Sequence, residues 1–136
     1  MKLFIHIDGA SRGNPGPASV GVVIRDGAGK TLKEHHRYLG EATNNVAEYS
    51  ALSDALALAK ELGGTELAIR SDSQLLVRQF NGQYRVKNPA LFKMLAEIQK
   101  IRHQFASITL IHVPREENKD ADRLANLALD QARAGL

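Results

Sequence analysis

Four acidic side chains occupy positions in the sequence where carboxylates could bind a metal ion: Asp8, Glu48, Asp72 and Asp122. Two of them follow short apolar runs, and two lie near the beginnings of helical patterns. Carboxylates without cysteine or paired histidine suit hard divalent cations such as Mg²⁺ or Mn²⁺. Two such ions roughly 4 Å apart can stabilise both the attacking and the leaving oxygen of a phosphodiester. This chemistry needs no protein nucleophile, and Ser11, Ser71 and Ser73 have no evident base to activate them.

The segment around Asp8 combines an apolar strand pattern with a turn-forming tract. Residues 3–7 are mostly apolar, and glycines follow the acid closely. Gly9, Gly13 and Gly16 can adopt positive φ and bring backbone N–H groups close to a ligand. An acid at the end of a buried strand, beside an open loop, is a place where α/β proteins hold a cation or a phosphate. The alternative interpretation is a capped turn that carries a solvated Asp8.

The composition limits the classes of protein to consider. With 136 residues, the chain is expected to form one domain, residues 1–136, with its own core. The absence of cysteine excludes disulfides and thiolate metal sites and fits a reducing compartment. No apolar run approaches membrane-spanning length, so we expect a cytoplasmic protein with no membrane partner. The net charge of +3 and the pI near 9.3 favour a polyanionic partner.

The spacing of apolar residues and turn signals predicts three antiparallel strands before the first helix. These strands are expected over residues 3–7, 19–25 and 31–39. Residues 26–29, with sequence DGAG, are typical of a hairpin turn. Alternation along the third strand places His35 and His36 on opposite faces, which makes them a poor metal-binding pair. His6 is interpreted as a core histidine with satisfied hydrogen bonds rather than as a metal ligand.

Glu48 is predicted to lie on the buried side of a helix. Thr43 opens a helical pattern that ends near Leu62, where two glycines follow. Glu48 stands one turn before Leu52, on the stripe that faces the sheet. A buried acid is costly unless it is paired or bound to a cation. The helix dipole would favour an acid in the first turn, but it does not explain why this acid lies on the buried face.

The order of the remaining elements brings two of the acids together. Residues 66–71 form a fourth strand pattern that leads into Asp72. The preceding helix is a crossover, so the first and fourth strands should be parallel. Asp8 and Asp72 then lie at the same, carboxyl-terminal edge of the sheet. The other expected elements are helices over 73–80 and 88–105, a strand over 107–113, a charged loop over 115–120, and a last helix with Asp122 in its first turn.

Four segments in this order resemble the motifs of type 1 ribonuclease H: IDGASRGNPGP at 7–17, TNNVAE at 43–48, SDSQ at 71–74 and NKDAD at 118–122. The resemblance covers essentially the whole chain. It implies an α/β, ribonuclease H-like fold. This fold is a five-stranded mixed sheet in the order 3-2-1-4-5, with its first three strands antiparallel and helices on both faces. The resemblance also implies an endoribonuclease that hydrolyses the RNA strand of RNA–DNA hybrids by a two-metal-ion mechanism, with Mg²⁺ as cofactor and Mn²⁺ able to substitute.

The same resemblance implies roles for individual residues. The metal ligands are expected to be Asp8, Glu48, Asp72 and Asp122. Contacts with the hybrid are expected at Gly9, Ser11, Gly13, Asn14, Thr43, Asn44, Asn45 and Gln74. The neutral amides among them suit 2′-hydroxyl groups, which distinguish RNA from DNA, and Thr43 falls near the family's pocket for a DNA phosphate. The expected partner is therefore an RNA–DNA hybrid, and the protein is expected to be a monomer.

The chain departs from the family pattern at two places. Many members carry a long, basic, tryptophan-containing insertion after the short helix, whereas residues 81–87 here are brief and contain no tryptophan. The family's loop histidine, which assists proton transfer and product release, is replaced by two candidates. His112 stands at about the right distance before Asp122, but in the fifth strand, and Arg115 lies on the loop itself. We expect Arg115, rather than His112, to assist catalysis by holding a phosphate. The alternative role for Arg115 is a surface ion pair with a neighbouring glutamate.

Two other functions are compatible with parts of the pattern. A related metal-dependent nuclease, such as an exonuclease, would share the acids, but the complete TNN and GNPGP matches argue against it. A non-catalytic module that binds the hybrid would be expected to lack one of the acids, and none is missing from the sequence. Incubation of labelled hybrid with Mg²⁺, with and without a chelator, separates these functions.

Overall fold

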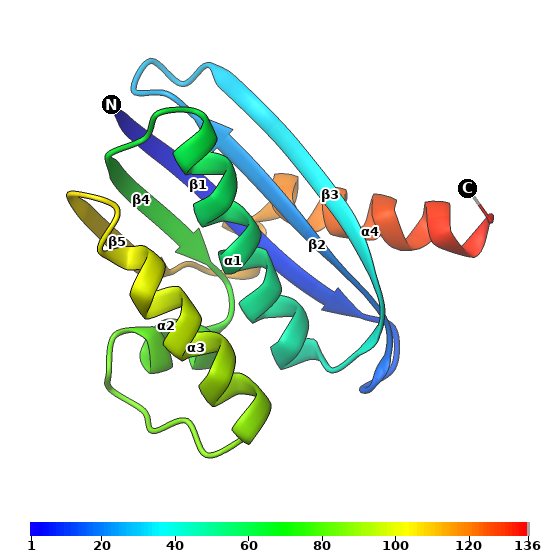
Figure 1. Cartoon of the computed structure of the whole chain (residues 1–136). Helices are drawn as coiled ribbons and strands as arrows, with labels where there is room; N and C mark the ends of the chain where they lie inside the picture. The colour runs from blue at the N-terminus through cyan, green and yellow to red at the C-terminus, as the bar shows by residue number, and fades with distance from the viewer. Residues whose placement is uncertain (136) are drawn as a thin grey trace.

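The structure of the protein is a computed structural model, which describes residues 1–135. Strands and helices follow each other along this part of the chain as shown in Figure 1. In order, the elements are β1 (Lys2–Ser11), β2 (Gly16–Arg25), β3 (Thr31–Ala42), α1 (Asn44–Glu61), β4 (Glu66–Ser71), α2 (Gln74–Phe80), α3 (Pro89–Arg102), β5 (Ser107–His112), the 3₁₀ helix η1 (Arg115–Glu117) and α4 (Lys119–Arg133). Thr43, Ser73 and Asn88 cap α1, α2 and α3 through side-chain oxygens that accept hydrogen bonds from the first turn, as their sequence positions predict.

The strands form one mixed sheet in the order β3-β2-β1-β4-β5. β1 pairs with β2, and β2 with β3, in antiparallel fashion, whereas the β1–β4 and β4–β5 pairs are parallel. In the parallel register Ile7 lies opposite Ser71, so the residues that follow, Asp8 and Asp72, lie at the same edge. The predicted strand order and directions are therefore confirmed, and β1 and β4 bring the two aspartates together.

Helices cover both faces of the sheet (Figure 1). α1, α2 and α3 share one apolar core with the sheet, and its buried members include Leu3, Ile7, Leu52, Leu76 and Ile98. α4 crosses the opposite face over β1, β2 and β3, where it buries Ala121, Leu124 and Ala125. The expected helices on both faces are confirmed. Within residues 1–135, none of the helices has the length and apolar character needed to cross a membrane.

Two glycines let a helix approach the sheet closely on each face. A Cβ atom at Gly9 of β1 would overlap the backbone of α1 at Glu48. A Cβ atom at Gly21 of β2 would overlap the carbonyl oxygen of Ala121 in α4. Because backbone atoms are the obstacle in both cases, a side chain there would push the whole helix away. Gly21 lies opposite Asp8 in the β1–β2 register, so α4 approaches the sheet beside that aspartate.

The strands around Asp8 are longer than the sequence pattern predicts. β1 continues past Asp8 to Ser11, and β2 already begins at Gly16, because residues 8–11 pair with residues 18–21 in the antiparallel ladder. The predicted end of the first strand at the acid is therefore wrong, and the turn is limited to residues 12–15. β3 likewise extends to Ala42, beyond the predicted end at residue 39, because it stays paired with the extended β2.

The boundaries of three later elements also differ from the predicted ones. α3 ends at Arg102, and Phe105 is buried after the helix rather than on it. β5 ends at His112, one residue earlier than predicted. The charged loop predicted for residues 115–120 contains η1 and the start of α4 at Lys119. Turn-type backbone hydrogen bonds form throughout this segment, and a local charge pattern does not reveal them.

The two histidines of β3 point to opposite faces of the sheet, as predicted. His35 donates from Nε2 to Asp54 of α1 (2.9 Å), whereas His36 donates from Nε2 to Gln131 of α4 (3.0 Å). His6 of β1 is half-buried rather than fully buried, and it donates from Nδ1 to Oδ1 of Asn118 (3.1 Å). Each of the three imidazole rings therefore has a hydrogen bond to a neighbouring side chain.

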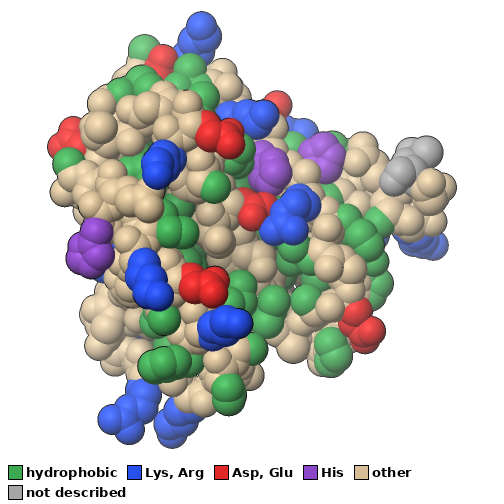
Figure 2. Space-filling view, in the orientation of Figure 1, with side chains coloured by type: hydrophobic (Ala, Val, Ile, Leu, Met, Phe, Trp, Pro, Cys, Tyr) green, Lys and Arg blue, Asp and Glu red, His purple; other side chains and the backbone are tan. Residues whose placement is uncertain are grey.

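Positive charge is concentrated on the part of the chain that forms α2, α3 and the loop between them. Residues 73–106 contain six Lys or Arg side chains and a single acid, whereas the rest of the chain carries more acids than cations. Figure 2 shows Lys and Arg side chains projecting from the lower end of the molecule, where α3 and the preceding loop lie. Two aromatic side chains of this part are exposed, Tyr84 (46%) and Phe92 (63%).

Candidate metal centre and active-site cleft

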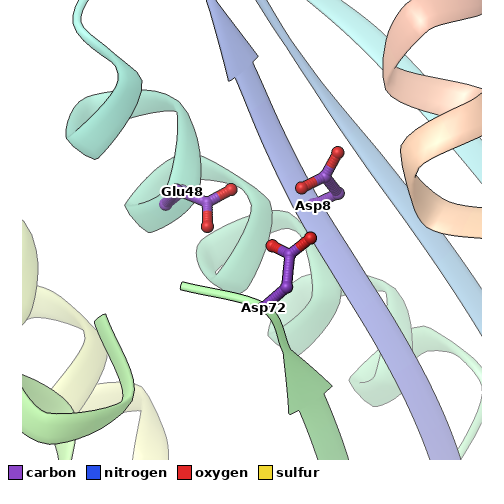
Figure 3. A group of neighbouring side chains, drawn as sticks. All are labelled: Asp8, Glu48 and Asp72. Carbon is purple, nitrogen blue, oxygen red and sulfur yellow. The ribbon is translucent and has the colours of Figure 1, made fainter. Parts of the chain in front are cut away.

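Three carboxylates converge where β1, α1 and the end of β4 meet. Figure 3 shows Asp8, Glu48 and Asp72 turned toward one another from these elements. One oxygen atom of each lies within 4.8 Å of the others. Asp8 and Glu48 are almost fully buried, with 5% and 4% of their surface exposed. A buried set of oxygen ligands of this kind could hold a hard divalent cation.

The position of Glu48 depends on the close contact between α1 and β1. Its Oε1 accepts a hydrogen bond from the backbone N–H of Gly9, the residue at which the two elements approach each other. Glu48 faces the sheet as predicted, but it is the fifth residue of α1 and therefore lies one turn later than the predicted first turn. β1 thus supplies one carboxylate, from Asp8, and also the backbone N–H of Gly9, which holds the carboxylate of Glu48 in place.

Burial and mutual repulsion make it costly for these acids to be ionised together. Burial, followed by the charges of the other three acids, raises the pKa of Asp8 well above its ordinary value. Burial also raises the pKa of Glu48, although the N–H of Gly9 and the hydroxyl of Ser73 stabilise the charged form and offset part of the effect. A divalent cation would compensate the repulsion, because its own charge outweighs those of the individual carboxylates.

Asp122 lies beside the group of three rather than within it. It stands in the first turn of α4, as predicted, and its side chain is close enough to Asp8 to raise the pKa of that residue. Its Oδ1 is 3.7 Å from Nη2 of Arg115 and 3.3 Å from Nδ2 of Asn126. Asp8 therefore belongs to two sets of acids. One set contains Asp8, Glu48 and Asp72, and the other contains Asp8 and Asp122.

A cleft of about 440 Å³ opens over the acids. All four predicted metal ligands line it. Gly9, Ser11 and Asn44, three of the predicted substrate residues, line it as well, and Arg12 and Arg115 contribute positive charge. The cleft thus combines carboxylates at its floor with polar and cationic groups that could contact a phosphodiester chain.

The other predicted substrate residues lie outside the lining of the cleft as described for residues 1–135. Oδ1 of Asn14 accepts a hydrogen bond from the backbone N–H of Asn44 (3.0 Å), which joins the β1–β2 turn to the start of α1. Thr43 caps α1 by accepting from the N–H of Val46 (3.2 Å). The remaining three residues are Gly13, which has a φ of 99°, the half-buried Asn45 and the exposed Gln74.

The structure distinguishes the two residues considered as catalytic assistants. Arg115 begins η1, lines the cleft and approaches Asp122, while its side chain remains 79% exposed and open to a ligand. His112 is an exposed residue at the end of β5, and it is not among the residues described as lining the cleft. The alternative role for Arg115 is an ion pair with a neighbouring glutamate, but in the described part of the chain its guanidinium instead approaches Asp122.

Three polar residues that line the cleft are missing from the predicted set: Arg12, Ser73 and Asn126. Arg12 and Ser73 lie within segments that resemble family motifs, so the sequence could have indicated that they lie near the site. Asn126 stands four residues after Asp122, and this spacing places both on one face of a helix. The contact between Arg12 and Asn126 could not be predicted, because it joins residues 114 positions apart.

Comparison with known proteins identifies the family. A family model described as "Reverse transcriptase-like" matches residues 6–128. The crystal structure of RNase H1 from the halophilic archaeon Halobacterium salinarum NRC-1 superposes with a TM-score of 0.94 at 41% sequence identity, covering 96% of this chain and 99% of that chain. The chain belongs to the ribonuclease H family. A crystal structure of LC11-RNase H1 in complex with an RNA/DNA hybrid is also similar, with a TM-score of 0.91, 46% identity, and coverage of 96% of this chain and 98% of that one.

Membership of the ribonuclease H family confirms the resemblance seen in the sequence motifs. The "Bifunctional protein Rv2228c" of Mycobacterium tuberculosis is 47% identical over 133 residues, which cover 97% of this chain. The chain spans only 36% of the length of that relative. The similarity therefore concerns the ribonuclease H part and not the remainder of the longer protein.

Proposed function

We propose that the protein is an endonuclease that hydrolyses the RNA strand of RNA–DNA hybrids. The observation that carries this proposal is the convergence of Asp8, Glu48 and Asp72, with Asp122 beside them, at the floor of an open cleft. Family membership supports it, as does the hybrid bound by the similar LC11-RNase H1. Asn44 lines the cleft and its backbone is joined to the side chain of Asn14, and amides of this kind suit recognition of an RNA strand through its 2′-hydroxyl groups.

We further propose Mg²⁺ as the cofactor, with Mn²⁺ able to substitute. The donor set consists of carboxylate oxygens alone, which Mg²⁺ and Mn²⁺ prefer. Glu48 and Asp72 would hold one ion together with Asp8, and Asp122 would hold a second one together with Asp8. When bound, these ions would polarise the scissile phosphate and make a water molecule more acidic.

The protein's own residues would bind and orient the substrate around this centre. Arg115 can hold a phosphate oxygen of the substrate or product by hydrogen bonds from its guanidinium group. Asn44, whose backbone is tied to Asn14, would present its amide to the RNA strand from the start of α1. Gly9 and Ser11 line the cleft on the β1 side, and they would also face the RNA strand of the hybrid. His112 is not given a role in this proposal.

A cleavage assay tests the proposed function directly. An RNA–DNA hybrid, a duplex RNA and a duplex DNA, each labelled at one end, are incubated with the protein in Mg²⁺, and parallel samples contain a chelator. Internal RNA fragments from the hybrid alone, abolished by the chelator, are expected. Release of single nucleotides from an end would indicate an exonuclease. Retention of intact hybrid without cleavage would indicate a binding module.

Replacing Mg²⁺ by Mn²⁺ in the same assay tests the choice of metal. Higher activity in Mn²⁺ at equal concentration would overturn Mg²⁺ as the preferred ion. Sedimentation or light scattering measures whether the protein is a monomer. This expectation, and that of a cytoplasmic location, remain predictions.

A further inference from the structure

α4 carries a row of polar side chains that runs outward from the candidate metal centre. Asp122, Asn126 and Asp130 follow one another at intervals of four residues, so they share one face of the helix. Arg12, directly after β1, reaches this row from the sheet. Its backbone N–H donates to the carbonyl of Pro17 (2.9 Å), which fixes the point from which its side chain extends.

Hydrogen bonds connect these residues from Arg12 to the acid. Nη2 of Arg12 donates to Oδ1 of Asn126 (3.3 Å) and to Oδ1 of Asp130 (2.7 Å). Nδ2 of Asn126 donates in turn to Oδ1 of Asp122 (3.3 Å) and to the backbone carbonyl of Asp122 (3.0 Å). The Asn126 amide therefore has a cation at its oxygen and a carboxylate at its nitrogen.

This arrangement selects one orientation of the amide. If the amide rotated by half a turn, its oxygen would face the carboxylate of Asp122 and its NH₂ group would face the guanidinium of Arg12. Both contacts would be repulsive, because a carboxylate only accepts and a guanidinium only donates. The cation of Arg12 thus ensures that Asn126 presents a donor, and not an acceptor, to Asp122.

We propose that Arg12 and Asn126 are positioning residues that hold Asp122 in the orientation needed for catalysis, an inference that rests on the proposed nuclease function. Asp122 stands outside the group of three acids, and its carboxyl group contacts Asn126 and Arg115 as well as Asp8. Asn126 and Arg115 both approach Oδ1, which leaves the second oxygen of Asp122 available to a cation shared with Asp8. Arg12 acts through Asn126 and needs no contact with the substrate.

The surroundings favour a positioning role over a purely structural one. The ion pair between Arg12 and Asp130 has side chains that are 39% and 64% exposed, and pairs of this kind contribute little to stability. α4 is already held to the sheet by its buried apolar face. The hydroxyl of Ser19 adds a buried hydrogen bond to the carbonyl of Ala125 (2.6 Å). The hydrogen bonds from Arg12 to Asp122 are therefore not needed to seat the helix.

Kinetics of single and double variants test the proposal. Asn126→Ala is expected to lower kcat about tenfold, with KM for the hybrid changed by less than about twofold. Arg12→Ala should lower kcat in the same way but by less, since Asn126 keeps its own bond to Asp122. In the double variant, the removal of Arg12 should add nothing, because its effect passes through Asn126. If the wild-type protein does not cleave the hybrid at all, it is the proposed function that fails and not this inference.

Gln131→Ala serves as the matched control. It removes another side-chain hydrogen bond between α4 and the sheet, to His36, farther along the helix from the acids. This variant should keep the wild-type kcat, and its melting temperature shows what the removal of one such bond costs. If Asn126→Ala merely matches this control in both respects, the positioning role is wrong. A decrease of kcat from Arg12→Ala that is the same with and without Asn126 would show that Arg12 acts independently, for instance on a substrate phosphate.

The side-chain amide of Asn126 gives a second readout that does not depend on activity. Held between Arg12 and Asp122, its NH₂ protons are expected to exchange slowly with water in NMR spectra of the metal-free protein. Arg12→Ala should shift these signals and speed their exchange, whereas Gln131→Ala should leave them unchanged. Signals that stay unchanged in Arg12→Ala would overturn the proposal.

Discussion

Among single residues, Asp8 has the most central position, because both sets of acids include it. Asp8→Asn keeps the shape of the side chain and removes one negative charge. We expect this variant to fold and to lose nearly all activity, since neither set of ligands would be complete. The melting temperature of the metal-free variant should equal or exceed that of the wild type, because asparagine enters this buried site without taking up a proton. Substantial Mg²⁺-dependent turnover by the purified variant would show that the metal assignment is wrong.

The raised pKa of the buried Asp8 carboxyl also predicts how stability depends on pH. Because the pKa of Asp8 is raised, the folded metal-free protein keeps a proton that the unfolded chain loses above the ordinary value of 3.8. The free energy of unfolding should therefore fall as the pH rises above that value, until Asp8 ionises in the folded state as well. Glu48 contributes a change of the same sign. Urea unfolding over a series of pH values should show a weaker dependence in Asp8→Asn, and identical curves would contradict the prediction.

Arg115 is the residue expected to assist the acids from the rim of the cleft. Arg115→Ala should lower kcat by roughly tenfold, equivalent to about 1.4 kcal/mol of activation free energy. The side chain is 79% exposed, so the melting temperature should hardly change. His112→Ala is the comparison, and it should leave kcat close to that of the wild type. If His112→Ala instead lowers kcat at unchanged melting temperature while Arg115→Ala has no effect, the histidine has the assisting role.

At the level of elements, the approach of α4 to the sheet decides where Asp122 lies. Gly21→Ala would place a Cβ atom against the carbonyl of Ala121 and push the first turn of α4 outward. Overpacking of this kind typically costs about 1–3 kcal/mol of stability, and kcat should fall because Asp122 moves away from Asp8. Gly27→Ala is the control, since the nearest atom to its Cβ is 4.0 Å away. Equal melting temperatures and equal kcat for the two variants would show that the contact is not limiting.

The sequence was sufficient to predict the sheet and the convergence of the acids at one edge of it, because the order of strands and helices restricts the topology. A helix between two strands allows few arrangements other than a parallel pair, so Asp8 and Asp72 had to share an edge. The period of α1 placed Glu48 on the sheet-facing side without any long-range information. The position of Asp122 in the first turn of α4 followed from its helical pattern, although its separation from the group of three did not.

The features that the sequence did not reveal depend on contacts between distant segments. The tract after Asp8 has the composition of a turn, yet residues 8–11 are held in the sheet by pairing with β2. Strand formation of this kind depends on partners and not on local propensity. The orientation of Asn126 likewise depends on Arg12, from the other end of the chain. Local patterns therefore identified the acids but not the groups that orient them.

At the level of the whole molecule, charge is divided between an acidic cleft and a basic lobe. The acids gather at the floor of the cleft, whereas residues 73–106 carry most of the excess positive charge. In the structure this basic lobe comprises α2, α3 and the loop between them (Figure 2). A nucleic acid is repelled by unoccupied carboxylates, so cations elsewhere on the surface must supply the attraction that brings it to the cleft. The basic lobe is the part of the described chain best suited to this role.

This division of charge predicts where the salt dependence of substrate binding originates. The double variant Arg85→Ala, Lys87→Ala removes two exposed cations of the basic lobe, from the loop that replaces the family's long insertion. We expect KM for the hybrid to rise and kcat to stay near the wild-type value, because these side chains lie away from the acids. The slope of log affinity against log salt concentration should decrease in magnitude by about one for each phosphate that is no longer neutralised by a cation of the protein.

The control is the double variant Lys30→Ala, Lys33→Ala. It removes the same charge from the β2–β3 hairpin and should change the slope much less. If both double variants lower the slope equally, net charge governs binding and the basic lobe has no special part in it.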